Sequence, residues 1–330
     1  MYQGRRFVRP GTYRQDALVG NAARAAASFF SAMPQSEPLK PSVTDAPRVH
    51  TAVTSAVIPA AGFGTRLRPL SDAIPKEMLP VGRQLALERI VAELVAAGIH
   101  RIVFVLSPAK ESFIRGRFGD GRDGVSFSYA LQAEMRGLGD AILRAEPALR
   151  PGEPFVVALG DAVFEEPEPG GLTGRLVRTC AEQGADVGLV VQKVPRERIS
   201  KYGVVAPAPG SAADGPFLAI SDIVEKPSPE EAPSEYAAAA RYVVPGDVFD
   251  ELRRTPPGKG GEIQLTDALR SLLRAGRRGV AVPLGAGEAR HDLGGLDSYY
   301  RAFVTFALAD GEHGADLRAY LEHTLNPADG

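Results

Sequence analysis

Residues 56–192 alternate between short apolar segments and segments with helical periodicity, and this alternation constrains the fold more than any other feature. Apolar residues recur every three or four positions over residues 87–95, and the apolar segment 102–106 follows. The other predicted strands are 56–58, 125–131, 155–159 and 187–192, and the other predicted helices are 138–146 and 172–183. Such alternation is typical of a sheet with helices on both faces and ligands at the carboxyl ends of its strands. The sequence therefore predicts a doubly wound α/β fold with a Rossmann-like, mainly parallel mixed sheet.

The pattern changes after about residue 193, where the extended segments 203–206, 217–224 and 236–244 follow one another without helical periodicity between them. We interpret these segments as an inserted antiparallel β region. Helical periodicity returns at 265–273 and 296–308. One face of the last helix carries an apolar stripe made of Leu296, Tyr299, Tyr300, Phe303, Val304 and Ala307. The stripe predicts packing in the core or against another subunit.

Composition argues against several classes of protein. The chain has 330 residues, 44% of them hydrophobic and 24% charged, which is ordinary for a globular protein with a sizeable core. Its formal net charge of −2 is unlike the strongly basic surface of a nucleic-acid-binding protein, so no polynucleotide partner is expected. The single cysteine, Cys180, excludes an intrachain disulfide and fits a reducing cytoplasm. Because no run of about 18 apolar residues is present, no membrane span is expected.

The first 50 residues differ in composition from the rest of the chain. They hold seven Lys or Arg residues against three Asp or Glu residues, a balance of +4, which leaves −6 for the remainder because the total is −2. Arg24 interrupts the only apolar run there, so a signal peptide is a poor match, and an Arg- and Ala-rich transit peptide is a weak alternative. We expect residues 1–50 to form a disordered N-terminal extension.

A glycine-rich turn follows the first predicted strand, and two cations follow the turn. Four small residues form it, namely Ala60, Ala61, Gly62 and Gly64. A backbone with so little side-chain bulk can approach a base or a phosphate closely. Arg66 would add a planar fork of donors and Lys76 a point charge, a combination that suits a polyphosphate. The alternative is a tight turn that needs glycine only for its backbone conformation.

Two well-known phosphate-binding motifs do not fit this turn. The dinucleotide pattern GxGxxG fails because Leu67 stands where the third glycine belongs. The P-loop pattern GxxxxGK[ST] is absent from the sequence. The spacing therefore excludes both of these sites.

The segment GxGTRLxPxSxxxPKEMLPV, at residues 62–81, resembles the signature of the sugar-nucleotide pyrophosphorylases. Within that family it is most similar to the bacterial UTP:glucose-1-phosphate uridylyltransferases. The resemblance continues in the same order down the chain, through QAEMRGLGDAI at 132–142, LGDAVF at 159–164, ISKYGVV at 199–205, IVEKPSPEEAPS at 223–234, ARYVV at 240–244, GGEIQLTDAL at 260–269 and RHDLGGLDSYYRAF at 290–303. It covers about residues 53–310.

This resemblance implies an enzyme of carbohydrate metabolism that converts UTP and glucose-1-phosphate into UDP-glucose and pyrophosphate. An oxygen of the sugar phosphate would attack the α-phosphorus in line with the leaving pyrophosphate. A phosphate with a second pKa near ~6 is largely dianionic at neutral pH, so this nucleophile needs no general base. The resemblance also implies Mg²⁺ as cofactor, a cytoplasmic location and a homo-oligomer. Residues 51–310 would form the catalytic domain and residues 311–330 a C-terminal helix or tail.

By the same resemblance, the turn residues would bind the nucleotide together with Gln132 and Gly137. The amide of Gln132 can donate and accept hydrogen bonds, as reading the imide edge of a uracil requires. A surface glutamine is the alternative. This loop departs from the family pattern, because Ala133 replaces a basic residue and Asp140 replaces a histidine. An acidic residue beside phosphates is unfavourable unless it faces away from them or touches metal or ribose.

The resemblance assigns catalytic roles to Arg66, Lys76 and Asp161, and makes Asp161 and Asp292 the ligands of Mg²⁺. A hard divalent ion prefers oxygen ligands, and magnesium usually takes one or two carboxylates together with phosphates and waters. The alternative for Asp161 is an aspartate that merely forms a turn after its strand.

On the sugar side, the resemblance makes Glu225 the acceptor of sugar hydroxyls and Lys226 a catalytic residue that binds the sugar phosphate. Successive residues of a strand point to opposite sides unless the chain bends, here at Pro227. A surface ion pair is the alternative. Gly203 would let its backbone amide approach the sugar. Ala240 stands where the family usually has glycine, and its methyl group would reshape the sugar pocket.

Two other functions stay open at this point. A related pyrophosphorylase could use another sugar- or cyclitol-1-phosphate, or another nucleoside triphosphate, as the changes at Ala133, Asp140 and Ala240 would permit. A non-catalytic regulator that binds a sugar nucleotide is of a different class. The retention of the predicted catalytic charges argues against it, because a sensor would not need them all.

Overall fold

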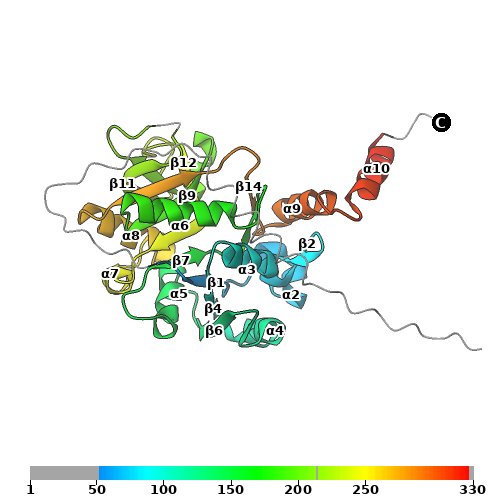
Figure 1. Ribbon diagram of the computed structural model, residues 1–330, viewed down its shortest axis with the longest axis horizontal. Coiled ribbons are helices and arrows are strands. Elements are labelled where there is room, and N and C mark those ends of the chain that lie inside the picture. The colour runs from blue at the N-terminus through cyan, green and yellow to red at the C-terminus, as the bar shows by residue number, and fades with distance from the viewer. Residues whose placement is uncertain (1–51, 213–214, 327–330) are drawn as a thin grey trace, which may run out of the picture. The chain divides into compact units, whose positions relative to one another are not determined.

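The computed structural model describes residues 52–212 and 215–326, and Figure 1 shows how their helices and strands are arranged. The strands are β1 (Ser55–Pro59), β2 (Pro80–Val81), β3 (Gln84–Leu85), β4 (Arg101–Leu106), β5 (Gly121–Arg122), β6 (Val125–Leu131), β7 (Phe155–Ala158), β8 (Ala162–Glu165), β9 (Val187–Lys193), β10 (Gly203–Pro207), β11 (Leu218–Glu225), β12 (Tyr236–Val244), β13 (Gly279–Pro283) and β14 (Ala289–Asp292). The helices are α2 (Leu70–Ala73), α3 (Ala86–Ala96), α4 (Pro108–Phe118), α5 (Leu138–Ala145), α6 (Gly171–Gln183), α7 (Val248–Arg254), α8 (Leu265–Arg274), α9 (Leu296–Leu308) and α10 (Gly314–Leu325).

Every strand and helix that the periodicity predicts is present, with its ends within one residue of the expected positions. The helices α4 and α7 and the strands β8, β13 and β14 are the main additions. The expectation for residues 1–50 lies outside the described residues. No described helix combines the length and the apolar character that a membrane crossing requires.

The main sheet has ten strands in the order β10-β11-β13-β9-β12-β7-β1-β4-β6-β5. The strands β7, β1, β4 and β6 are parallel neighbours, as are β9 and β13. The strands β5, β11 and β12 run against their neighbours, so the sheet is mixed. The α/β prediction is thus confirmed at the level of a mixed sheet joined by helices.

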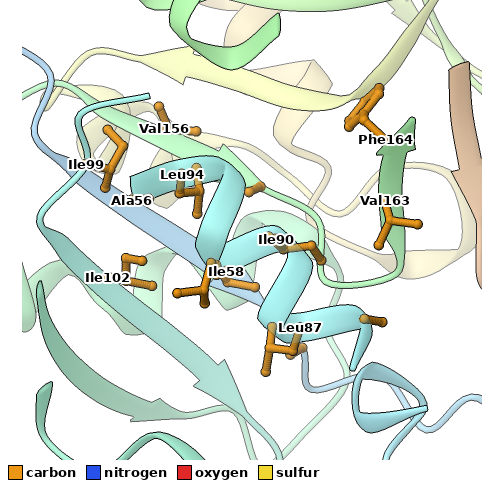
Figure 2. Packing of buried hydrophobic residues seen from close by; sticks show 14 of the residues in the cluster. Ala56, Ile58, Leu87, Ile90, Leu94, Ile99, Ile102, Val156, Val163 and Phe164 are labelled. Carbon is orange, nitrogen blue, oxygen red and sulfur yellow. The ribbon is translucent and has the colours of Figure 1, made fainter. Parts of the chain in front are cut away.

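Hydrophobic side chains from the sheet enter two separate cores. Along β1, Ala56 and Ile58 belong to a cluster with residues of α3, α4, α6 and α9. Val57, which points the opposite way, belongs to a second cluster with residues of α5, α7 and α8. Figure 2 shows α3 lying across β1, and Leu87, Ile90 and Ile58 belong to the same cluster. Helices therefore pack on both faces of the sheet, and the site must lie at an edge.

The position of β12 corrects one expectation, because this strand is not a peripheral part of an insertion. It lies inside the main sheet between β9 and β7, antiparallel to both. All nine residues of β12 are buried, as expected for a strand that is covered on both faces. Periodicity predicts that a segment is extended, but it does not identify the neighbours of the strand.

Two strands share one edge of β12, and they separate at an irregularity. Ala237 pairs with β9 on one side and with β10 on the other, whereas Tyr242 pairs with β9 and with β7. The pairing register shifts between Ala238 and Tyr242, and Ala240 within this stretch has a φ of 65°. The strands β7 and β10 therefore diverge on either side of Ala240, and this split separates the two halves of the candidate site.

The C-terminal helices show that the apolar stripe on α9 is only partly in the core. In Figure 1, α9 lies beside β14 and β2, and α10 packs on α9. Tyr299 is buried, but Tyr300, Phe303 and Val304 are exposed by 56%, 38% and 41%. The core interpretation therefore holds for Tyr299 and is wrong for those three residues. The subunit-contact interpretation of the same residues stays a prediction.

Candidate active site

The glycine-rich turn begins where β1 ends, at the edge of the sheet that carries the carboxyl ends of the parallel strands. The N–H of Ala60 donates to the carbonyl of Val105 at 2.8 Å, which continues the β1–β4 pairing into the turn. Gly64 has a φ of 67°, in the left-handed region that favours glycine. A methyl group built on Gly64 would lie 3.3 Å from the Lys76 side chain. The turn and Lys76 are therefore in close contact.

Lys110, a buried lysine that the sequence analysis did not single out, forms hydrogen bonds with the backbone of this turn. The ammonium group of Lys110, on α4, donates to the carbonyl of Ala60 at 2.8 Å and to the carbonyl of Gly62. It also bonds both carboxylate oxygens of Glu77, at 2.9 and 2.8 Å. Glu77 is fully buried, and burial raises its pKa although the charge of Lys110 opposes that effect. The only feature of the sequence that pointed to this pair was the place of Glu77 in the PKEM motif.

Lys76 and Asp161 form an ion pair at the centre of the site. The ammonium nitrogen of Lys76 lies 2.7 Å from an oxygen of Asp161, which follows β7. Burial lowers the pKa of Lys76, but the charges of Asp161, Glu77 and Asp292 outweigh it and raise the pKa above its ordinary value. Burial raises the pKa of Asp161, and the charges of Lys76 and Arg290 overcome this and lower it. Both groups are therefore charged at neutral pH.

The second predicted carboxylate, Asp292, lies next to Asp161. Strand β14 pairs with β8, so that Asp292 faces Ala162, and the N–H of Leu293 donates to the carbonyl of Asp161 at 2.8 Å. A methyl group built on Gly294 would lie 2.9 Å from both the Arg66 guanidinium and the Asp292 carboxylate. The fold therefore gathers these two carboxylates and the two predicted cations, Arg66 and Lys76, in one place.

This donor set suits a magnesium ion. Two carboxylates beside a candidate phosphate loop match an ion that takes few protein ligands and completes its shell with phosphates and waters. Within residues 52–212 and 215–326, no three His, Cys, Asp or Glu side chains converge into a closed metal cage. Asp161 and Asp292 would hold the ion, and Lys76 now neutralises Asp161.

Gln132 and Gly137 lie on the loop that follows β6, at the same edge of the sheet. The N–H of Gln132 donates to the carbonyl of Leu106 at 2.8 Å, which ties this loop to the end of β4. Gly137 has a φ of 101°, and a methyl group there would lie 2.7 Å from the carbonyl oxygen of Ile263. Only glycine fits where this loop packs against residues of the GGEIQLTDAL segment.

Both oxygens of Asp140 are engaged by neighbouring side chains, so its charge is partnered within the loop and α5. Asp140 is buried, and its two oxygens accept hydrogen bonds from the Gln132 amide and from Arg144, each at 2.8 Å. Ala133, the other departure in this loop, is exposed.

The predicted sugar residues meet where β10 begins and β11 ends. Gly203 pairs with Glu225, and a methyl group on Gly203 would lie 2.8 Å from the Thr266 side chain. The hydroxyl of Thr266 donates to Glu225 at 2.7 Å. Lys226 has a φ of 47° and lies 3.1 Å from Glu225, so the two side chains meet and do not diverge as on a regular strand. The ion pair that the sequence left as an alternative is thus present.

A fully buried arginine, also missed in the sequence, links the sugar side to the metal side. The Arg241 guanidinium bonds both oxygens of Glu93 on α3, at 2.7 and 2.6 Å. It also donates to the carbonyl of Ala240 at 3.0 Å and to that of Ala162 at 3.2 Å. Arg241 therefore fixes the irregular segment of β12 and the residue that follows Asp161. Its only signal was its place in the segment ARYVV.

Arg290 is a further cation that the sequence analysis did not assign. It lies two residues before Asp292 on β14, and its guanidinium is 5.8 Å from the centroid of the Tyr202 ring. Its Nε is buried and has no hydrogen-bond partner among the described residues. The charge of Arg290 therefore lies between the predicted metal ligands and the loop that contains Gly203.

Comparisons with known proteins cover all of these residues. A family model for nucleotidyl transferases matches residues 55–307. A UTP--glucose-1-phosphate uridylyltransferase from Streptococcus pyogenes is 35% identical over 294 residues, covering 82% of this chain and 94% of that protein. The crystal structure of a UDP-glucose pyrophosphorylase complexed with UDP-glucose aligns with a TM-score of 0.70 and 30% identity, over 78% of this chain and 100% of that chain. A UTP-bound UGPase from Acinetobacter baumannii aligns with a TM-score of 0.73 and 29% identity, over 82% and 98% of the two chains.

Proposed function

The chain belongs to the nucleotidyl transferase family, and from this premise we propose that it converts UTP and glucose-1-phosphate into UDP-glucose and pyrophosphate. One observation of the structure carries this proposal. The glycine-rich turn, the Lys76–Asp161 pair and Asp292 lie together at the edge of the sheet where parallel strands end. A site with two carboxylates and several cations, but no paired nucleophile and base, suits the joining of two phosphates.

In the proposed reaction, an oxygen of the sugar phosphate forms a bond to the α-phosphorus of UTP. The bond from that phosphorus to the bridging oxygen breaks, and pyrophosphate leaves with the electron pair. The dianionic sugar phosphate already has the electrons that it needs, so no side chain must remove a proton. The protein brings two mutually repelling anions together, and Arg66 and Lys76 stabilise the charge on the leaving group.

Asp161 and Asp292 are the proposed holders of Mg²⁺, which when bound neutralises phosphate charge during the transfer. The adjacency of these two residues, which follows from the pairing of β14 with β8 and from the hydrogen bond between Leu293 and Asp161, supports this role. Release of Lys76 from Asp161 would free the ammonium group for the triphosphate.

The proposed sugar half consists of Gly203, Glu225, Lys226 and Ala240. Glu225 ends β11 and has an oxygen bonded to Thr266, which holds the carboxylate in place for sugar hydroxyls. Lys226 would bind the sugar phosphate. Its left-handed backbone, together with the hydrogen bond from its N–H to the carbonyl of Tyr202 at 2.9 Å, supports a fixed position.

We also interpret the sheet as doubly wound, with β10 and β11 as the inserted region on the sugar side. The two hydrophobic cores and the divergence of β7 and β10 support this. The catalytic domain would span residues 51–310. A homo-oligomer is proposed on the exposed apolar residues of α9. A cytoplasmic location is proposed on the single cysteine, which is buried.

The experiment that tests this function is pyrophosphate release with Mg²⁺ across a grid of nucleoside triphosphates and sugar-1-phosphates. We expect UTP with glucose-1-phosphate to dominate. Dominant release with another sugar-1-phosphate would favour the related pyrophosphorylase, and the strained Ala240 in the sugar half is the observation that keeps this second function in view. No release with any pair would contradict the enzymatic function and leave a binding protein.

A further inference from the structure

The side-chain amide of Gln132 has only one orientation that satisfies its neighbours. Its nitrogen lies 2.8 Å from a carboxylate oxygen of Asp140 and 3.1 Å from the carbonyl oxygen of Gly137. An ionised carboxylate and a backbone carbonyl can only accept hydrogen bonds. The NH₂ group must therefore face both of them, because the opposite orientation would place the amide oxygen against two acceptors.

This arrangement uses both donors of Gln132 and leaves only its oxygen for a ligand. Among the described residues, that oxygen accepts no hydrogen bond, and it is not one of the buried unpaired atoms. Gln132 is only 3% exposed, so solvent, or a ligand in place of solvent, meets this oxygen through a small opening. In this arrangement, the side chain of Gln132 offers a ligand only a hydrogen-bond acceptor.

Asp140 is held firmly in the position from which it orients the amide. Its side chain is nearly fully buried, and its second oxygen pairs with Arg144 at 2.8 Å, one helical turn along α5. The N–H of the adjacent Gly139 donates to the carbonyl of Ile263 at 2.8 Å, which docks the start of the helix on the next segment. The carboxylate therefore cannot swing away without breaking these contacts.

We propose that Asp140 is a positioning residue that sets nucleobase choice by presenting Gln132 to the base as an acceptor only. A base with an N–H at the middle of its pairing edge, as in uracil or thymine, satisfies the free oxygen. Cytosine has a lone pair at that position and would leave two acceptors facing one another. This inference rests on the proposed function, because it assumes that Gln132 contacts the base.

The test is equilibrium binding of UTP and of CTP, without sugar phosphate, to the full chain and its variants. Wild type is expected to prefer UTP by about 100-fold or more, because a buried polar group left unpaired is costly. In Asp140→Asn the new amide can donate to Gln132, so a Gln132 amide that turns half a revolution opposes one acceptor, the carbonyl of Gly137, in place of two. The UTP:CTP preference is expected to fall about tenfold or more in this variant.

A matched control is Asp186→Asn, at the start of β9, where Asp186 accepts hydrogen bonds from Arg277 and from the N–H of Arg278. It removes a similar charge at the opposite end of the strands and is expected to leave the UTP:CTP preference unchanged. If Asp140→Asn does not fold, Arg144→Met replaces it in the test. This variant removes the half-exposed arginine that pairs with the Asp140 carboxylate. It is expected to lower the preference in the same direction by a smaller factor.

Two results would overturn the inference. One is a wild type that binds UTP and CTP equally, or binds neither. The other is an unchanged preference in Asp140→Asn, or in Arg144→Met where Asp140→Asn does not fold. A wild type that selects UTP but releases no pyrophosphate with any sugar phosphate would contradict the proposed function alone, because the binding preference is measured without turnover.

Discussion

The two halves of the candidate site, called here the nucleotide wall and the sugar wall after their proposed ligands, hold their backbones in place by different means. In the nucleotide wall, formed by residues 60–64 and 132–140, the left-handed positions are glycines, Gly64 and Gly137. In the sugar wall, formed by residues 202–203, 225–226 and 240, they are Lys226 and Ala240. A left-handed residue other than glycine costs roughly 1–2 kcal/mol, so the sugar wall stores strain that the nucleotide wall does not.

The buried side chains that support the two walls also differ. Lys110 and Glu77 lock the nucleotide turn directly, through carbonyls of the turn itself. Arg241 and Glu93 support the sugar wall through the backbone behind it. The comparison teaches that the nucleotide wall is supported directly, whereas the sugar wall holds backbone strain that a single substitution can relax.

The largest expected effect is on the support of the nucleotide wall. Lys110→Met would leave the Glu77 carboxylate buried without a partner, which costs about 3–5 kcal/mol of unfolding free energy. Denaturant unfolding would measure the loss. The double variant Lys110→Met/Glu77→Gln should recover part of it, since no buried charge then remains. A loss below about 1 kcal/mol in the single variant would show that the pair does not hold the turn.

Asp161 lies where the walls meet, and its replacement tests the chemistry shared by both. Asp161→Asn removes the charge that pairs with Lys76 and would hold the metal, so turnover should fall roughly 10²- to 10³-fold. Binding of UTP should change far less. Pyrophosphate release and UTP titration would measure the two. An equal loss in both would contradict the assignment of Asp161 to the transfer step.

Lys226→Ala should damage the sugar wall alone. Loss of a charged contact to phosphate raises the KM for the sugar phosphate about 10- to 100-fold, with little change for UTP. Lys201→Ala, an exposed lysine in the same wall region, is the control and should leave both constants unchanged. Similar increases for both substrates in Lys226→Ala would place this lysine outside the sugar wall.

The free energy of unfolding should also depend on pH through Glu166, which lies near Glu93 in the support of the sugar wall. Burial, with the nearby charge of Glu93, raises the pKa of Glu166 from 4.5 to about 7. A raised carboxyl pKa stabilises the fold fully below pH ~4.5, and the contribution is lost as the pH rises through ~7. Unfolding free energy should thus fall over this range by on the order of 1 kcal/mol more in wild type than in Glu166→Gln. Parallel curves would contradict the shift.

The smallest expected effect is a gain from relaxing the sugar wall. Ala240→Gly removes a left-handed alanine, and after the entropy cost of glycine a stabilisation of about 0.5–1 kcal/mol remains. Thermal unfolding would measure it, and the KM for a panel of sugar-1-phosphates would report any change in acceptor range. Ala239→Gly, at a neighbouring buried position outside the left-handed region, should destabilise instead. A destabilised Ala240→Gly would contradict the strain argument.

Periodicity predicted the elements well because each depends on neighbours in sequence. The strand at 236–244 and the helix at 87–95 are where their apolar patterns place them. The central position of β12 could not be predicted, since pairing with β7 and β9 is decided by residues far away along the chain.

The same limit applies to the candidate site. The resemblance assigned Lys76 and Asp161 to one catalytic site, but it did not predict the ion pair of 2.7 Å that the structure shows between them. The supports Lys110 and Arg241 escaped notice because their acidic partners, Glu77 and Glu93, lie 33 and 148 residues away, with no local pattern to mark them. The bond between Asp140 and Gln132 was equally hidden, although both residues were singled out in the sequence.

Strand β12 lies late in the sequence, and this position affects how the nascent chain can fold. Strands β7 and β9 are complete by residue 193, but the strand that joins them begins only at residue 236. A nascent chain that has emerged to residue 235 therefore has β7 as an unpaired edge of its parallel strands, and β9 without either of its partners, β12 and β13. Unpaired strands of this kind can pair with other chains. Pairing of β12 with both strands then joins the two walls, and the second predicted metal ligand, Asp292, follows only with β14.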